Sequence, residues 1–187
     1  MALIKPAASD EVRRALIAGI ADFVEPDDPL GPALHKAELG LHIFTLGLSN
    51  IANQEGFADA KPAGWRFLAG SSVGEAIAGD VMEIPPGTAP RMTSVSHDPL
   101  VGRAIQAVHE LESLPEVHHQ DYELNVVRIP GLLIEAFWLK SRGKGPDLVI
   151  PVLTRETGLK RMKPYPMEQF LTEVEPLVEK FLAFDRD

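Results

Sequence analysis

The stretch 121-DYELNVVRIPGLLIEAFWL-139 decides the fold, because it indicates the central strands of a sheet. Its apolar side chains fall on both faces of an extended chain, which is typical of a strand pair in the middle of a sheet. The Pro-Gly dipeptide at 130–131 supplies either a hairpin turn or a kink. A two-residue turn would pair Val126 with Glu135 and set Arg128 diagonally from Glu135, within reach of a salt bridge.

Further strands flank this pair in the sequence. Alternating residues predict a strand at 41–46, and two runs at 64–70 and 74–84 predict a hairpin whose turn lies between them. Residues 147–153 make one more strand, in which Pro151 indicates an edge position or a bulge. Because short turns join consecutive strands, we expect a mainly antiparallel sheet of five to six strands.

Three main helices are expected beside these strands. The first spans residues 9–24 with Ser9 as N-cap, the second follows the Asp98 cap and runs to about Ser113, and the third begins near Pro166. Each carries one apolar stripe, as a helix that covers a sheet does. We therefore predict an α+β fold, built as one domain over residues 1–187.

Composition excludes several function classes. The chain has 18 basic and 27 acidic residues, a net charge of 18 − 27 = −9, which disfavours nucleic acid as a partner. Cysteine is absent, so disulfides, thiolate nucleophiles and cysteine-ligated metals are excluded. The longest uncharged run, residues 39–54, has 16 residues and is too short and polar to span a bilayer. We expect a soluble cytoplasmic protein without a cofactor or a membrane span.

Two clusters resemble reactive sites and are better explained by local structure. His118, His119 and Asp121 lie within four residues, but in a strand two of them at most share a side, and zinc requires three or four protein ligands. No metal is therefore expected. Adjacent Ser96, His97 and Asp98 cannot converge as a catalytic triad does, and a helix cap before Pro99 accounts for Ser96 and Asp98.

Basic residues are concentrated between Lys140 and Lys163. This segment contains seven basic and two acidic residues, so its local charge is 7 − 2 = +5. The candidate partner-binding or anion-binding residues in this segment are Arg142, Lys144, Lys160, Arg161 and Lys163. The glycines of 141-SRGKGPD-147 would let backbone N–H groups approach an anion, although a solvated hairpin loop is the ordinary explanation.

The C-terminal helix is acidic, so it could bind the basic segment of a second copy of the chain. Its carboxylates are Glu168, Glu173, Glu175 and Glu179. Attraction between the two patches predicts a homodimer that salt weakens.

Glu135 is the single carboxylate within the apolar run 132-LLIEAFWLK-140, and burial would raise its pKa toward that of a general base. Two hypotheses follow. The preferred one is a non-catalytic interaction domain that binds a protein partner or itself through the sheet or the C-terminal helix with the basic segment. The alternative is an enzyme or ligand-binding protein whose site contains Glu135, Arg128, Tyr122 and a histidine, which a closed pocket around Glu135 would favour.

Overall fold

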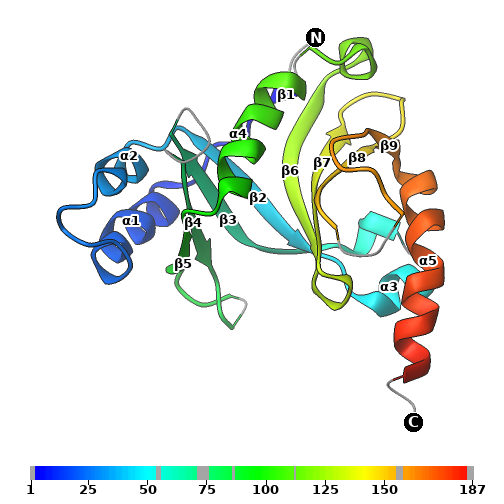
Figure 1. Cartoon of the computed structure of the whole chain (residues 1–187), viewed down its shortest axis with the longest axis horizontal. Coiled ribbons are helices and arrows are strands. Elements are labelled where there is room, and N and C mark those ends of the chain that lie inside the picture. Colours follow the sequence, from blue (N-terminus) through cyan, green and yellow to red (C-terminus); the bar gives the residue numbers. More distant parts are fainter. Residues whose placement is uncertain are drawn as a thin grey trace.

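The computed structural model describes residues 3–53, 56–70, 76–85, 87–111, 113–154 and 158–184. These residues form one mixed sheet of nine strands, in the order β5-β4-β3-β2-β6-β7-β8-β9, with β1 also paired to β6 (Figure 1). Pairing is antiparallel except where β6 lies parallel to β2 and to β1. The strands are β1 (Leu3–Ile4), β2 (Leu39–Thr45), β3 (Lys61–Ala69), β4 (Ile77–Met82), β5 (Arg91–Ser96), β6 (Tyr122–Ile129), β7 (Ile134–Ser141), β8 (Leu148–Leu153) and β9 (Tyr165–Pro166).

Five α-helices occur in the described ranges: α1 (Asp10–Gly19), α2 (Leu30–His35), α3 (Leu48–Ala52), α4 (Pro99–Leu111) and α5 (Met167–Phe184). Short 3-10 turns are η1 (Ile20–Asp22), η2 (Gly56–Asp59), η3 (Pro115–His119) and η4 (Pro130–Leu132). In the part of the chain that the structure describes, no helix is both long enough and apolar enough to cross a bilayer.

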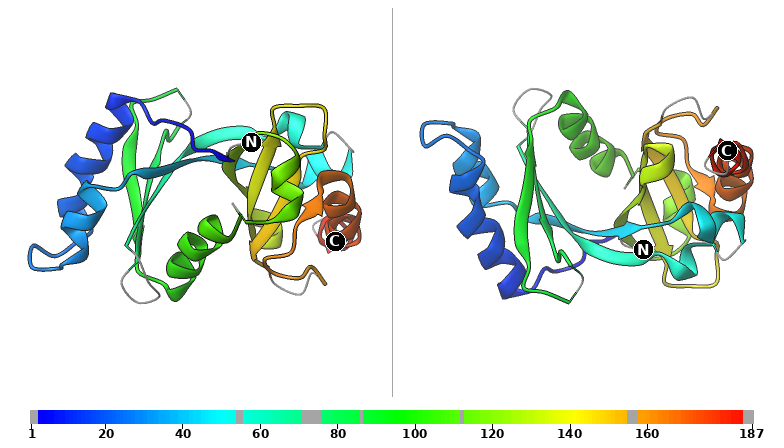
Figure 2. Two further views of the ribbon diagram at one scale, coloured as in Figure 1. Left: turned by 90° about the horizontal axis from the view of Figure 1, so that it is seen from above. Right: turned by 90° about the horizontal axis from the view of Figure 1, so that it is seen from below.

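The sheet is bent, so that β3–β5 and β6–β8 face each other with α4 between them (Figure 2). A buried core on this concave side joins α4 to both halves of the sheet, through residues such as Leu68, Ile105, Val126 and Ile150. Two further cores lie on the outer side. One packs α1 and α2 against β3 and β4, and the other packs α3 and α5 against β6–β8.

The helix starts follow the caps that the sequence predicts. The Ser9 hydroxyl accepts a hydrogen bond from the Val12 N–H at 3.3 Å, and the Asp98 carboxylate accepts one from the Leu100 N–H at 2.7 Å. Each side chain satisfies a backbone donor that has no partner within the first helical turn. The second predicted helix is described as far as Leu111, close to its expected end.

The predicted α+β class is confirmed, whereas the count and the pairing of elements differ. The sheet is mixed and larger than the five to six antiparallel strands expected. Helix α2 adds to the three main helices predicted, and α3 lies where Ser49 indicates a short turn of helix. The parallel contact between β2 and β6 arises because β3, β4, β5 and α4 separate them in sequence and the chain then returns to β2. Strand β5 lies outside the strands that the sequence predicts.

The hairpin of β6 and β7 has a longer connection than two residues. Ile129 pairs with Ile134, so four residues connect the strands and Arg128 lies directly opposite Glu135. The register that pairs Val126 with Glu135 is therefore wrong, since Val126 pairs with Phe137. Near Pro151 the pairing with β7 shifts by one residue, as in a bulge, which is one of the two alternatives predicted there. The expected hairpin of β3 and β4 forms, while its turn at 71–75 lies outside the described residues.

Candidate functional site

Four charged side chains form a closed ring of ion pairs on the concave face of the sheet. Arg66 of β3 contacts Asp80 of β4, with 2.9 Å between Nε and Oδ1. Arg128 of β6 contacts Asp80 at 2.7 Å and Glu135 of β7 at 3.0 Å. A bond from Arg66 Nη1 to Glu135 Oε1 completes the ring. Each member thus contacts two neighbours of opposite charge.

The curvature of the sheet makes this ring possible. Arg66 pairs across the sheet with Asp80, and Arg128 pairs with Glu135, while β2 separates the two pairs. In a flat sheet, β3 and β7 would be three strand spacings apart, about 14 Å. The bend at β2 brings the two halves close enough for side chains to meet (Figure 2). The ring therefore links β3 and β4 directly to β6 and β7.

The pKa shifts of Asp80 and Arg66 both favour the charged form, because each side chain lies beside two groups of opposite charge. Burial alone would raise the pKa of Asp80, but hydrogen bonds and charges from Arg66 and Arg128 outweigh it and hold that pKa below its usual range. Burial disfavours the charged form of Arg66, and the carboxylates of Asp80 and Glu135 nevertheless raise its pKa. The Ser94 hydroxyl adds a hydrogen bond to Asp80 at 3.3 Å.

Both carboxylate oxygens of Glu135 are held by arginine. Its Oε1 accepts from Arg66 and its Oε2 accepts from Arg128. The arrangement is well suited to joining strands, and its four charges sum to zero.

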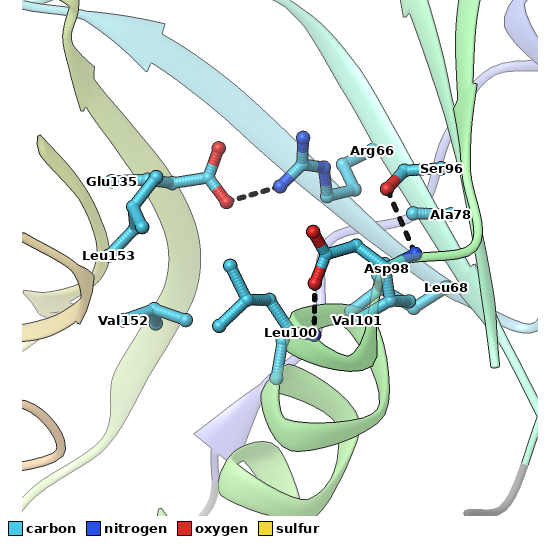
Figure 3. Close-up of a pocket in the computed structure, with 11 residues that line it drawn as sticks. Arg66, Leu68, Ala78, Ser96, Asp98, Leu100, Val101, Glu135, Val152 and Leu153 are labelled. Carbon is cyan, nitrogen blue, oxygen red and sulfur yellow. Dashed lines mark hydrogen bonds and ion pairs between the residues drawn. The ribbon is translucent and has the colours of Figure 1, made fainter. Parts of the chain in front are cut away.

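A cavity of about 140 Å³ lies between this ring and the start of α4 (Figure 3). Arg66 and Glu135 line it from the sheet, Asp98 lines it from the start of α4, and Leu100 and Val152 contribute apolar walls. The carboxylate of Asp98 is exposed at the mouth. Glu135 is 22% exposed, so the alternative site predicted around it is a partly enclosed cavity.

The structure brings together two of the three residues predicted for that alternative site. Arg128 and Glu135 are in contact, whereas Tyr122 lies six residues from Arg128 at the other end of β6, about 20 Å along an extended strand. The Tyr122 hydroxyl donates to the Pro146 carbonyl at 3.4 Å. Tyr122 therefore does not lie in one site with Glu135, contrary to the prediction from the sequence.

Sequence reasoning missed Arg66 and Asp80. A signal was present, because each is the one charged residue inside an apolar strand, in 65-WRFLA-69 and 76-AIAGDVM-82. A charge in such a position is seldom buried unless it is paired. Pattern alone does not identify the partners across β2.

The basic candidates lie at the surface, and some already have partners. Arg142 pairs with Glu123, and Arg161 donates to the Thr154 carbonyl at 3.3 Å. The Lys163 ammonium group lies 4.8 Å from the centre of the Tyr165 ring. All five candidates, Arg142, Lys144, Lys160, Arg161 and Lys163, are exposed, while Arg155 lies outside the described residues.

Several backbone N–H groups of the loop 141–147 already donate hydrogen bonds within the protein. The N–H of Ser141 donates to Asp147 at 2.8 Å, that of Gly143 to the Ser141 hydroxyl at 3.2 Å, and that of Gly145 to the Gln120 side chain at 2.8 Å. These three groups cannot serve as a cradle for an anion in this conformation. Any anion at this loop would depend on the side chains of Arg142 and Lys144.

Helix α5 starts beside this loop and carries acidic side chains. The Met167 N–H donates to the Asp147 carbonyl at 3.0 Å, which holds the first turn of α5 next to residues 141–147 (Figure 1). Positions 168, 175 and 179 are spaced by seven and four, so Glu168, Glu175 and Glu179 share one stripe of the helix. Glu173 projects from another side, because it lies outside that spacing.

The structure separates the two clusters that resembled reactive sites. Asp98 caps α4, and the Ser96 hydroxyl accepts from the Asp98 N–H at 3.3 Å. His118 and His119 belong to the 3-10 turn η3 and not to a strand, and Asp121 precedes β6. Across the described ranges, no three metal-ligating side chains gather closely enough to hold an ion.

Comparisons with known proteins give no relative. No protein-family model, no curated protein and no solved structure matches this chain. The proposals below therefore depend on the residues of this chain alone.

Proposed function

We propose that this protein is a non-catalytic interaction domain that self-associates through α5 and the adjoining basic loops. The basic cluster is defined as Arg142, Lys144, Lys160, Arg161 and Lys163, and the acidic stripe as Glu168, Glu175 and Glu179. Two copies related by a two-fold axis would pair the basic cluster of each with the acidic stripe of the other. Such an isologous contact closes after two copies and does not continue into a filament.

One observation carries this proposal: an exposed basic cluster adjoins the start of an acidic helix, through the Met167–Asp147 hydrogen bond. Helix α5 has 18 residues and is therefore about 27 Å long. Antiparallel packing of two such helices would set the start of one, with its basic loops, beside the acidic end of the other. The helix dipoles would also be antiparallel in this arrangement.

The non-catalytic part of the proposal is supported by the ring of ion pairs. Arg66, Asp80, Arg128 and Glu135 neutralise one another, and both oxygens of Glu135 are engaged by arginine. This arrangement supports a structural role for the ring, which holds the two halves of the sheet together.

A pair of complementary charge variants tests the proposed contact. Lys144→Glu/Lys160→Glu lowers the charge of the basic cluster from +5 to 3 − 2 = +1, and Glu175→Lys/Glu179→Lys changes the charge of the acidic stripe from −3 to 2 − 1 = +1. Each variant alone should self-associate more weakly than wild type, because the substituted side chains would face side chains of like charge. An equimolar mixture should form a one-to-one complex, which sedimentation velocity and native mass spectrometry would detect.

A control on the same helix separates position from net charge. Glu173→Lys changes the charge by the same amount as Glu179→Lys but lies off the acidic stripe. We expect Glu173→Lys to keep the dimer and Glu179→Lys to weaken it about fivefold or more. If the two variants behaved alike, or if the complementary pair failed to associate, the proposed contact would be wrong.

The cavity containing Glu135 favours a second candidate function, the binding of a small ligand next to the ring. Its lining combines the Arg66–Glu135 pair and Asp98 with apolar side chains of Leu100 and Val152. A fragment screen by NMR tests this candidate through the methyl signals of Leu100 and Val152. Absence of shifts there across the screen would exclude it.

A further inference from the structure

A second, larger cavity lies at the other end of α4. It has a volume of about 450 Å³ and opens between the second half of α4, the end of α2, and the adjoining ends of β2 and β3. This volume falls within the range of about 300–1,000 Å³ that is usual for small-molecule sites. It shares Leu68 with the cavity beside the ring, and the two have no charged lining residue in common.

The floor of this groove is apolar. Ile105 and Val108 face it from α4, Leu68 faces it from β3, and Leu39 faces it from the start of β2. Ile105, Val108 and Leu68 are buried in the concave core, and Leu39 is partly exposed. A hydrocarbon chain lying here would contact side chains that the fold already holds in fixed positions.

The rim of the groove is mainly basic. Lys5, Lys36 and His109 line it together with one acidic residue, Glu38, and all four are exposed. With the histidine neutral, the rim carries a charge of 2 − 1 = +1, on a chain whose net charge is −9. The rim is thus positive on a protein that is negative as a whole, and it would attract an anion over short range.

From the apolar floor and the basic rim, we infer that this groove binds a small amphipathic anion. The ligand class is a free medium-chain carboxylate, whose hydrocarbon chain lies along Leu39, Leu68, Ile105 and Val108. Its carboxylate lies at the rim near Lys36, where the ammonium group donates a charge-assisted hydrogen bond. This site is independent of the proposed dimer, because none of its lining residues belongs to α5 or to the basic cluster.

Three probes of equal chain length separate the role of charge from that of the hydrocarbon. Octanoate, octanol and octylamine carry negative, neutral and positive heads on the same eight-carbon chain. Octanoate should bind with a Kd below about 1 mM, octanol about tenfold more weakly, and octylamine more weakly still. Isothermal titration gives the affinities, and NMR shifts of Leu39, Ile105 and Val108 locate the ligand.

Two charge variants at the rim should change the affinity for octanoate in opposite directions. Lys36→Glu should weaken octanoate binding about fivefold, and Glu38→Gln should strengthen it about twofold. Both positions are exposed, so the fold should persist, which the NMR spectrum of each variant confirms. Lys61→Glu is the matched control, because Lys61 is exposed at the start of β3 and does not line the groove.

Several results would overturn the inference. They are equal affinity for the three probes, no binding of octanoate up to about 10 mM, or NMR shifts that map to the basic cluster instead of the groove. Octanoate binding should be unchanged in Glu175→Lys/Glu179→Lys, so failure of the dimer and failure of this site give different results.

Discussion

Asp80 is the most enclosed member of the ion-pair ring, with a side chain 8% exposed. It accepts hydrogen bonds from both arginines and from Ser94, so its removal leaves two partly buried guanidinium groups short of a partner. Breaking a buried ion pair in this way costs about 3 kcal/mol or more. We predict that Asp80→Asn lowers the free energy of unfolding by about 3 kcal/mol, measured by urea denaturation.

Two further variants serve as comparisons for the loss of stability in Asp80→Asn. Glu135→Gln should cost less, about 1 kcal/mol, because Glu135 is 22% exposed and water can partly replace the lost charge. Asp27→Asn, an exposed substitution with the same chemical change, should be close to neutral. A loss in Asp80→Asn no greater than that in Asp27→Asn would show that the ring does not stabilise the fold.

The ring also predicts a dependence of stability on pH. The folded-state pKa of Asp80 lies below its unfolded value of about 3.9, so its contribution is present above that value and is lost as pH falls through the folded-state pKa. The stability difference between wild type and Asp80→Asn should be constant from about pH 7 to pH 5 and should shrink below about pH 4. Urea unfolding across this range measures it, and a constant difference down to about pH 2 would contradict it.

His42 changes the stability in a higher pH range than Asp80, so the two contributions can be separated. Burial lowers the pKa of His42, and the charge of Glu123 partly opposes the shift. Acidification below about pH 6.5 therefore destabilises the fold through His42 in wild type and in Asp80→Asn alike. Their difference isolates Asp80.

At the residue scale, the sequence predicts half of the ring. The Arg128–Glu135 pair follows from the strand period around a turn, even though the predicted register was two residues short. Arg66 and Asp80 could not be joined to them, because that requires the order of strands around β2 and the bend of the sheet. Neither property is encoded in the spacing of residues along one strand.

Among the elements, the hairpin of β6 and β7 has one unusual position. Leu133 ends the four-residue connection with φ of 51°, in the left-handed region that a side chain seldom adopts, and its side chain is 52% exposed. Glycine adopts this conformation without steric cost. We predict that Leu133→Gly raises the free energy of unfolding by about 0.5 kcal/mol, measured by urea denaturation.

The neighbouring Leu132 supplies the control. It is buried within η4, so Leu132→Gly removes packed side-chain atoms and should cost about 2 kcal/mol or more. A similar loss in both variants would show that the conformation of Leu133 carries no strain.

Helix starts were the elements best predicted from sequence. Ser9 and Asp98 each accept the bond that their chemistry predicts, because a cap depends on residues three positions away or fewer. The parallel pairing of β2 with β6 was not predicted, since it joins residues such as His42 and Asn125 that are far apart in the chain. Strand β5 was missed because its serine-rich sequence lacks an apolar alternation.

For the whole molecule, the distribution of charge is the basis of the proposed function. The sequence shows a basic segment and an acidic helix, and the fold brings the basic loop at 141–147 next to the start of that helix. Adjacency in space could not be deduced from the sequence, because it depends on how β8 and β9 return the chain. A contact built from exposed charges weakens as salt shortens the Debye length.

The molar mass in solution at two salt concentrations tests the proposed self-association most directly. Sedimentation equilibrium should approach 2 × 20.4 = 40.8 kDa at about 50 mM sodium chloride, and should fall toward the monomer mass of 20.4 kDa at about 500 mM. A mass of 20.4 kDa under both conditions would contradict self-association. A dimer unaffected by salt would contradict the charged contact through α5.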